Sequence, residues 1–258
     1  MDGRGIPDEA TRSRVRKFLL QAGDCGHFVL RGTDAVGLAS TADAEATRLL
    51  GGLSDCGDSS CSCCRLSSPR ARPQFCDFVV QHVLSTCGTR PIRYVSLGCG
   101  MLLTDAQLLC GLVEGGATIQ QIVLVDNQYD VGEHRGTIGY DRAIAQLATF
   151  FAPASCITFN APSKLLHGSL EADVIVACDA GEAISRGLPR LASALLAEGG
   201  IAATLMNGGR YGSTTRAWIR PDTRREDPQP LAMGRSVVEI EVPREADAGP
   251  PFPPHMAW

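Results

Sequence analysis

The sequence predicts an α/β protein with a doubly wound, mostly parallel sheet, helices on both faces, and an N-terminal helical extension. Between Ile92 and Asn207, short segments that are apolar on both faces alternate with segments of helical periodicity. This alternation favours parallel strands joined by helical crossovers, and right-handed crossovers place helices on both faces. Glycines such as Gly23 and Gly88 end the predicted helices, as is typical of helix C-termini.

The first ninety or so residues are predicted to form helices and loops rather than sheet. Helical spacing is present in three segments, 8–23, 41–52 and 73–88. Residues 54–73 are rich in Ser, Gly and Pro and have no periodicity, which is typical of a loop. We therefore expect a helical cap over 1–89, with a Cys-rich loop at about 54–73, followed by a sheet domain over 90–245.

The sheet domain is predicted element by element from its apolar pattern. Strands are expected at 92–97, 122–126, 155–160, 172–179 and 201–207. Helices are expected at 105–116, 137–151 and 188–200, and Thr104 with Gln107 fits a capping box for the first. Residues 236–242 predict a late antiparallel edge strand, 216–225 a solvated surface, and 246–258 a Pro-rich tail.

Composition and charge argue against several classes of protein. The chain has 258 residues and a formal net charge of −4, so it lacks the basic footprint of a nucleic-acid-binding protein. No apolar run approaches the roughly 20 residues of a membrane-spanning helix, and the N-terminus lacks the apolar core of a secretory signal. The 11 cysteines, without such a signal, favour a reduced cytoplasmic setting over a disulfide framework.

The segment VSLGCGMLLTD, residues 95–105, places two glycines where a buried strand meets a helix. Either the turn is simply tight, or a ligand lies against the backbone beside the free N–H groups of the helix N-terminus. Asp126 closes the next strand, where a carboxylate can accept hydrogen bonds from two vicinal ribose hydroxyls. Together, Gly98, Gly100 and Asp126 favour a ligand site at the carboxyl ends of the strands.

With IVLVD, ADVIVACD and LLAEGG, the LGCG turn resembles the class I S-adenosylmethionine-dependent methyltransferases over about Ile92 to Asn207. The resemblance implies a Rossmann-like fold, S-adenosylmethionine as cofactor, and methyl transfer to a small-molecule or protein acceptor. It implies cofactor contacts at Gly98, Cys99, Gly100, Asp126, Asn127 and Asn160. It also implies that Asp179, after the fourth strand, faces the methyl-transfer centre as the candidate catalytic residue.

Two positions depart from the pattern of that family. Ser96 stands where the family usually has an acid, and Leu102 replaces the third glycine. Because leucine disfavours a positive φ, we expect helical or extended backbone at Leu102 and a helix that begins near Thr104. The leucine side chain is expected to lie between sheet and helix, which leaves the pocket open.

Several residues also have a simpler interpretation. Asp179 can cap the following helix, and Tyr129 can pack instead of stacking on an adenine. The thiols of the Cys-rich loop lack the paired spacing of structural zinc sites, so no metal is expected at Cys56, Cys61, Cys63 and Cys64. Two other functions stay open: a non-catalytic scaffold of the same fold, and a nicotinamide-dependent oxidoreductase, for which the last glycine of G-x-G-x-x-G is missing.

Overall fold

The computed structural model describes residues 8–24, 53, 62, 63, 68, 70–88, 90–129, 138–167, 169–208, 212–222 and 237–241, and the elements below lie within them. The strands are β1 (Ile92–Leu97), β2 (Ile119–Val125), β3 (Ser155–Phe159), β4 (Ala172–Cys178), β5 (Leu196–Asn207), β6 (Ser213–Ile219) and β7 (Val238–Glu241). The helices are α1 (Glu9–Asp24), α3 (Ala71–Cys87), α4 (Leu103–Glu114), α5 (Ile138–Phe150), α6 (Glu182–Leu195) and the 3₁₀ helix η2 (Pro162–His167).

The described strands form one sheet in the order β3-β2-β1-β4-β5-β6-β7. Strands β1 to β5 are parallel, whereas β6 and β7 are antiparallel additions at one edge. Because β1 lies between β2 and β4, the winding of the chain reverses there, which is the switch point of a doubly wound sheet. The predicted Rossmann-like fold class, with its mostly parallel sheet, is confirmed.

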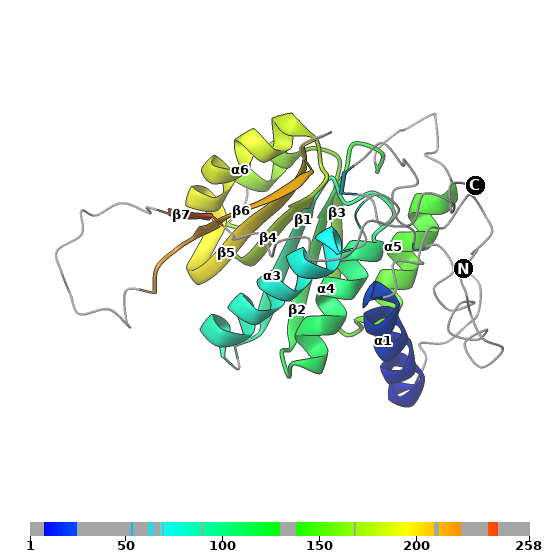
Figure 1. Ribbon diagram of the computed structural model, residues 1–258. Helices are drawn as coiled ribbons and strands as arrows, with labels where there is room; N and C mark the ends of the chain where they lie inside the picture. Colours follow the sequence, from blue (N-terminus) through cyan, green and yellow to red (C-terminus); the bar gives the residue numbers. More distant parts are fainter. Residues whose placement is uncertain are drawn as a thin grey trace, which may run out of the picture.

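Helices cover both faces of the sheet (Figure 1). On one face, α1, α3, α4 and α5 form an apolar core with Ile92 and Tyr94 of β1. On the other face, α6 and η2 pack with Val95 and Leu97 of the same strand. Alternate residues of a strand point to opposite faces, so burial of both faces explains why this strand shows no polar alternation in the sequence.

The N-terminal helix α1 confirms the helix predicted at 8–23 and packs on α4 (Figure 1). Arg16 Nε donates to Glu114 Oε1 at 2.9 Å, and Gln107 Nε2 donates to the Leu19 carbonyl at 3.0 Å. Helix α3 confirms the helix predicted at 73–88. The helix predicted at 41–52, the tail at 246–258 and most of the Cys-rich loop lie outside the described residues.

The helix predicted at 188–200 is wrong at both ends. Helix α6 begins at Glu182, so Pro189 lies inside it rather than in its first turn. Ile184 and Ser185 already lie against the sheet, which extends the buried stripe towards the N-terminus. Strand β5 then begins at Leu196, because that residue pairs with β4 and sheet hydrogen bonds replace helical ones.

The sequence prediction misses strand β6. Residues 216–225, expected to form a solvated surface, instead contain the end of β6, in which Ala217 and Trp218 are buried. The arginines around these residues hide the apolar positions in the sequence pattern. The predicted edge strand at 236–242 is confirmed as β7, which is antiparallel to β6.

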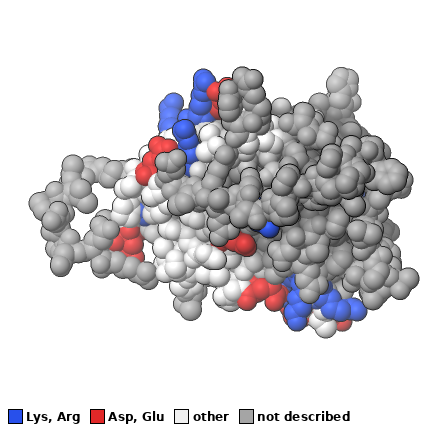
Figure 2. Space-filling view, viewed as in Figure 1, with Lys and Arg blue, Asp and Glu red and all other residues white. Residues whose placement is uncertain are grey.

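No helix in the described part of the chain is long and apolar enough to cross a membrane. On the face shown in Figure 2, acidic and basic side chains lie next to one another. Exposed pairs such as Glu182 and Arg186 on α6 contribute at most about 1 kcal/mol each. A stronger electrostatic contact than these exposed pairs is made by a buried aspartate, Asp173.

That contact is a carboxylate that ties β1 to β4 at their amino ends. Asp173, near the start of β4, is fully buried. Its Oδ2 accepts hydrogen bonds from the Arg93 backbone N–H at 2.9 Å and from Arg93 Nε at 3.0 Å, and Arg90 Nη2 lies 2.8 Å from Oδ1. The buried charge is tolerated because both oxygens are paired, and removing one partner leaves the other uncompensated.

Loss of the Asp173 carboxylate is expected to destabilise the fold strongly. The Asp173→Ala change should lower the free energy of unfolding by about 3–5 kcal/mol, because it removes the buried carboxylate that compensates the charge of the partly buried Arg93. Glu171→Ala is the matched control, since Glu171 is an exposed partner of the same arginine and should cost less than about 1 kcal/mol. Urea unfolding followed by circular dichroism measures both, and equally small effects would contradict the role given to Asp173.

Candidate functional site

The chain leaves β1 through a turn that contains three left-handed residues. The φ angle is +63° at Gly98, +52° at Gly100 and +66° at Leu102. The Gly98 N–H donates to the Val125 carbonyl at 2.7 Å, which ties the turn to β2. A Cβ on Gly98 would lie 2.5 Å from the Cβ of Ala180, whereas a Cβ on Gly100 would have no heavy atom within 4 Å. Gly98 therefore permits the close packing of two turns, and Gly100 leaves open space beside its backbone.

The prediction for the Leu102 backbone is wrong, and the prediction for its side chain is confirmed. Leu102 is left-handed, whereas the helix start predicted near Thr104 is confirmed to within one residue, because α4 begins at Leu103. The Leu102 side chain is 1 % exposed in the core between sheet and helices. Burying a leucine contributes about 1.5–3 kcal/mol, which offsets the roughly 1–2 kcal/mol cost of the left-handed backbone. The capping box is also wrong, since Thr104 and Gln107 lie buried inside the helix.

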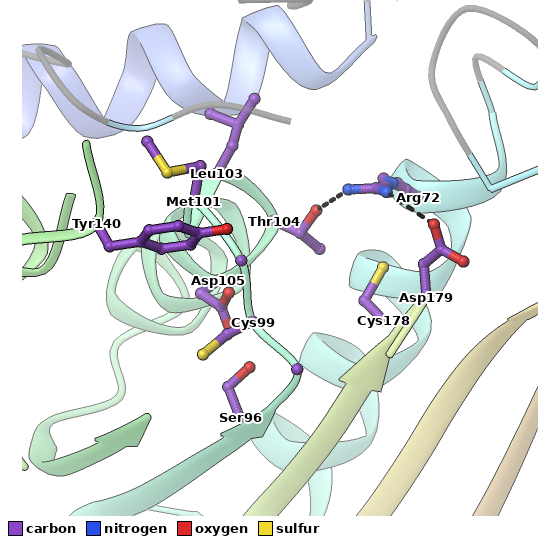
Figure 3. Close-up of a pocket in the computed structure, with 12 residues that line it drawn as sticks. Arg72, Ser96, Cys99, Met101, Leu103, Thr104, Asp105, Tyr140, Cys178 and Asp179 are labelled. Carbon is purple, nitrogen blue, oxygen red and sulfur yellow. Dashed lines mark hydrogen bonds and ion pairs between the residues drawn. The ribbon is translucent and has the colours of Figure 1, made fainter. Parts of the chain in front are cut away.

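A cavity of about 350 Å³ opens where β1 and β4 end (Figure 3). This is the carboxyl edge at the switch point, where open α/β sheets bind their ligands. Four of the predicted site residues line the cavity: Gly98, Cys99, Gly100 and Asp179. Leu102 is not among the lining residues, so its side chain leaves the cavity open, as predicted.

One wall of the cavity is organised by Arg72, which the sequence prediction places at the end of a loop without a role. Arg72 is 6 % exposed near the start of α3. Its Nε donates to the Cys63 carbonyl at 2.7 Å, its Nη1 donates to Thr104 Oγ1 at 3.0 Å, and its Nη2 lies 3.8 Å from Asp179 Oδ2 (Figure 3). The N-cap of α6 is Gly181, so Asp179 forms an ion pair here instead of capping that helix.

Part of the Cys-rich segment is anchored at the same edge of the sheet. Ser62 Oγ donates to Asn207 Oδ1 at 2.8 Å and accepts from the Gly208 N–H at 3.1 Å. Cys63 is fully buried. Because β5 pairs with β4, these contacts hold the segment beside the strand that carries Asp179. The other thiols of the cluster lie outside the described residues, so the absence of a metal at Cys56, Cys61, Cys63 and Cys64 stays a prediction.

Another wall contains a buried carboxylate to which the sequence prediction assigns no function. Asp105 of α4 is 4 % exposed and lines the cavity (Figure 3). The Tyr94 hydroxyl donates to Asp105 Oδ1 at 2.7 Å, and the Ser96 side chain also bonds to this carboxylate. Burial raises the pKa of Asp105 above its ordinary value of 3.8, although these hydrogen bonds and the charge of Arg72 oppose the shift. The family resemblance expects an acid at position 96, where this chain has a serine. Asp105, which bonds to Ser96, places a carboxyl group next to that position.

Asp126 holds the glycine turn in place from the end of β2. Its Oδ2 accepts the Gly100 N–H at 2.9 Å, and its Oδ1 accepts the Gln128 N–H at 3.0 Å. The Tyr129 hydroxyl donates to the Gly100 carbonyl at 3.2 Å and lies 3.1 Å from Cys99 Sγ, so Tyr129 packs against the turn. Burial raises the pKa of Cys99 well above its ordinary value, which keeps the thiol protonated.

The remaining predicted cofactor contacts are not among the residues that line the cavity. Asp126 and Asn127 follow β2, and Asn160 follows the neighbouring strand β3. The Asp126 N–H donates to the Phe159 carbonyl at 3.1 Å, which holds these strand ends together. The predicted contacts are therefore distributed along the carboxyl edge, from the cavity at β1 to the end of β3.

Comparison with known proteins finds similar solved structures and no matching family. No protein-family model matches the chain, and no curated protein matches it. Among solved structures, it is similar to the fibrillarin pre-rRNA processing protein of Methanococcus jannaschii, with 15% identity, a TM-score of 0.31 and 46% of each chain covered. It is also similar to Aeropyrum pernix fibrillarin, solved with natively bound S-adenosyl-L-methionine, with 16% identity, a TM-score of 0.33 and coverage of 49% of this chain and 52% of that one.

The match spans about half the length of those two structures. A third similar structure, which covers 93% of this chain and 89% of the other, is a Plasmodium falciparum protein assigned as a protein-L-isoaspartate O-methyltransferase, in complex with S-adenosyl-L-homocysteine. Its identity is 10% and its TM-score 0.42. These similarities concern the fold alone. The strand order and the glycine turn define the class of the fold, a Rossmann-like α/β protein.

The two glycines of the turn are expected to respond differently to a methyl group. Gly98→Ala should lower the free energy of unfolding by at least about 2 kcal/mol, because it combines a steric overlap with Ala180 and a positive φ. Gly100→Ala keeps only the conformational cost, about 1 kcal/mol, because its surroundings are open. Chemical unfolding of both variants measures the difference. Equal losses of unfolding free energy would show that close contact with Ala180 is not what requires glycine at position 98.

The titration of Asp105 is expected to make stability depend on pH. Burial raises the pKa of Asp105 in the folded state. The stability that the protonated group contributes to the fold is therefore complete at low pH, and it is lost as the pH rises through the folded-state pKa. Asp105→Asn removes this loss. As the pH rises from about 4 to about 7, the stability of the Asp105→Asn variant should therefore increase relative to that of the parent protein. Unfolding measured at several pH values checks the sign, and movement in favour of the parent protein would contradict it.

Proposed function

We propose that the protein binds S-adenosylmethionine at the carboxyl edge of the sheet and transfers its methyl group to a small-molecule or protein acceptor. The observation that carries this proposal is the cavity at the switch point, lined by the Gly98–Gly100 turn and by Asp179. These are the positions that the resemblance to class I methyltransferases assigns to the cofactor and to the transfer centre.

The residues of the cavity suit this cofactor. The volume of about 350 Å³ lies within the range of small-molecule sites, and Gly100 leaves open the space that a side chain would fill. Two carboxylates and one guanidinium, those of Asp105, Asp179 and Arg72, are among the lining groups, so the local field favours a ligand with a positive centre such as a sulfonium.

The part of the cofactor outside the cavity would extend along the carboxyl edge of β2 and β3. In this proposal, Asp126 accepts hydrogen bonds from the ribose hydroxyls with the lone pairs that the backbone amides leave available. Asn127 and Asn160 then lie on the adenine side, where their amides can donate and accept hydrogen bonds.

Methyl transfer needs alignment of the acceptor and exclusion of water more than covalent help from the protein. The bound cofactor supplies an activated methyl group on a positively charged sulfur. We assign Asp179 to orient the acceptor and to take up its proton where one is released. Cys99 and Tyr140, whose pKa values are raised by burial, stay protonated and are not bases at neutral pH.

One observation favours a second candidate function, a non-catalytic scaffold that binds the cofactor. Asp179 forms an ion pair with Arg72, which holds its carboxylate on the wall of the cavity and away from an acceptor. This candidate predicts cofactor binding without turnover. A nicotinamide-dependent oxidoreductase is less well supported, since the last glycine of its fingerprint is replaced by Leu103, which is buried.

Asp126 is expected to contribute directly to cofactor affinity. Asp126→Ala removes two charged hydrogen bonds, each worth about 1.5–3 kcal/mol, so affinity should fall at least about tenfold. Asp126→Asn keeps an oxygen that can accept the Gly100 N–H and therefore separates ligand binding from support of the turn. Calorimetric titration with S-adenosylhomocysteine measures both. If the Asn variant binds like the parent protein, the carboxylate only supports the turn.

The proposed function is tested by calorimetric titration of the protein with S-adenosylmethionine and, separately, with NAD. We expect one site for S-adenosylmethionine, with a dissociation constant on the order of micromolar, and no heat with NAD. Binding of NAD alone would overturn the proposal. A methyl-release assay on candidate acceptor pools then separates an active transferase from a binding scaffold.

A further inference from the structure

The function proposed above gives Asp105 no contact of its own with the ligand, although it is the more deeply buried of the two carboxylates in the cavity. Asp105 is 4 % exposed, whereas the Asp179 side chain is 19% exposed. Withdrawing an ionised carboxylate from water is costly unless its charge is compensated. For Asp179 the compensation is the ion pair with Arg72, so the compensation of Asp105 remains to be explained.

The side-chain partners of Asp105 within the described residues are neutral hydroxyls. The Tyr94 hydroxyl donates to Oδ1 at 2.7 Å, and Ser96 bonds to the same carboxylate. Arg72 acts on Asp105 only at a distance, since its guanidinium bonds to Thr104, the preceding residue. Two hydroxyls therefore hold the carboxylate in position, and within the described part of the chain no cation contacts it directly.

The open side of this carboxylate faces the cavity. Asp105, Ser96 and Cys99 all line it, as do Gly98 and Gly100, and Figure 3 shows the three side chains close together. A cation inside the cavity would lie against a fixed, largely desolvated carboxylate, which is a strong and directional contact. Among the described residues that line the cavity, the cation is Arg72, which is held on the other wall by Cys63, Thr104 and Asp179, so we expect a cation beside Asp105 to come from the ligand.

We infer that Asp105 binds the α-ammonium group at the amino-acid end of the cofactor, with Ser96 and Tyr94 as positioning residues. The inference rests on the proposed function and adds a specificity-determining residue to it. Helix α4 then supplies the acid that the family resemblance expects at the end of β1, where Ser96 stands. A bound ammonium would also oppose the effect of burial on the pKa of Asp105 and favour its ionised form.

The test uses two ligands that differ in one group. S-adenosylhomocysteine carries the ammonium, and its deaminated analogue keeps every other part of the molecule. The full chain should bind S-adenosylhomocysteine at least about tenfold more tightly than the analogue, as expected for a charged hydrogen bond. In the nearly isosteric Asp105→Asn variant this preference should disappear. Asp141→Asn removes the same charge from an exposed position on α5 and should keep the preference.

The outcomes separate the inference from the function on which it rests. If the parent protein binds both ligands equally, or if Asp105→Asn keeps the preference, Asp105 does not bind the ammonium. Equal weakening of both ligands in the variant, with the preference retained, would mean that Asp105 only supports the turn, and this too overturns the inference. If the parent protein binds neither ligand, the proposed function itself fails. The comparison in the parent protein requires no substitution, so the inference is tested even if a variant does not fold.

Discussion

The close contact between Gly98 and Ala180 is the constraint on which the candidate site depends. It brings together the turns that follow β1 and β4, the two strands at which the winding of the sheet reverses. Both turns need left-handed backbone, at Gly98 and Gly100 after β1 and at Asp179 and Gly181 after β4. The cavity lies between these turns, so the backbone that permits the strands to pack also shapes the ligand site.

The charges of the site are arranged around this backbone frame. Arg72 reaches from α3 to α4 and to the end of β4, and its guanidinium fixes one wall. Asp105 on another wall is held by hydroxyls of β1, among them that of Ser96. The substitution of an acid by Ser96 thus does not remove the carboxyl group from the site, because α4 supplies one from a different position in the sequence.

The sequence predicts the parts of the molecule that follow from local pattern. The parallel strands, the Gly-Cys-Gly turn and the placement of Asp179 at the carboxyl edge all follow from apolar periodicity and from the topology of a doubly wound sheet. The left-handed backbone of Leu102 could not be predicted in this way. It exists because burial of the side chain outweighs a local conformational preference, and burial depends on contacts with distant residues.

Tertiary contacts also explain the functional residues that sequence reasoning misses. Arg72 lies at the boundary of an irregular segment, and Asp105 looks like an ordinary acid in the first turn of a helix. The nearest signal for Asp105 is the absence of an acid at Ser96, which indicates that a carboxyl group is needed from elsewhere. Strand β6 is missed because its buried Trp218 stands between arginines, and only pairing with β5 defines its face.

The central claim is that the turn after β1 and the cavity beside it form one ligand site for S-adenosylmethionine. A crystal structure of the complex with S-adenosylhomocysteine tests this most directly. We expect the amino-acid end to lie in the cavity beside Gly100 and Asp105, and the ribose to lie at Asp126. A ligand bound away from the carboxyl edge, or held there with the cavity empty, would contradict it.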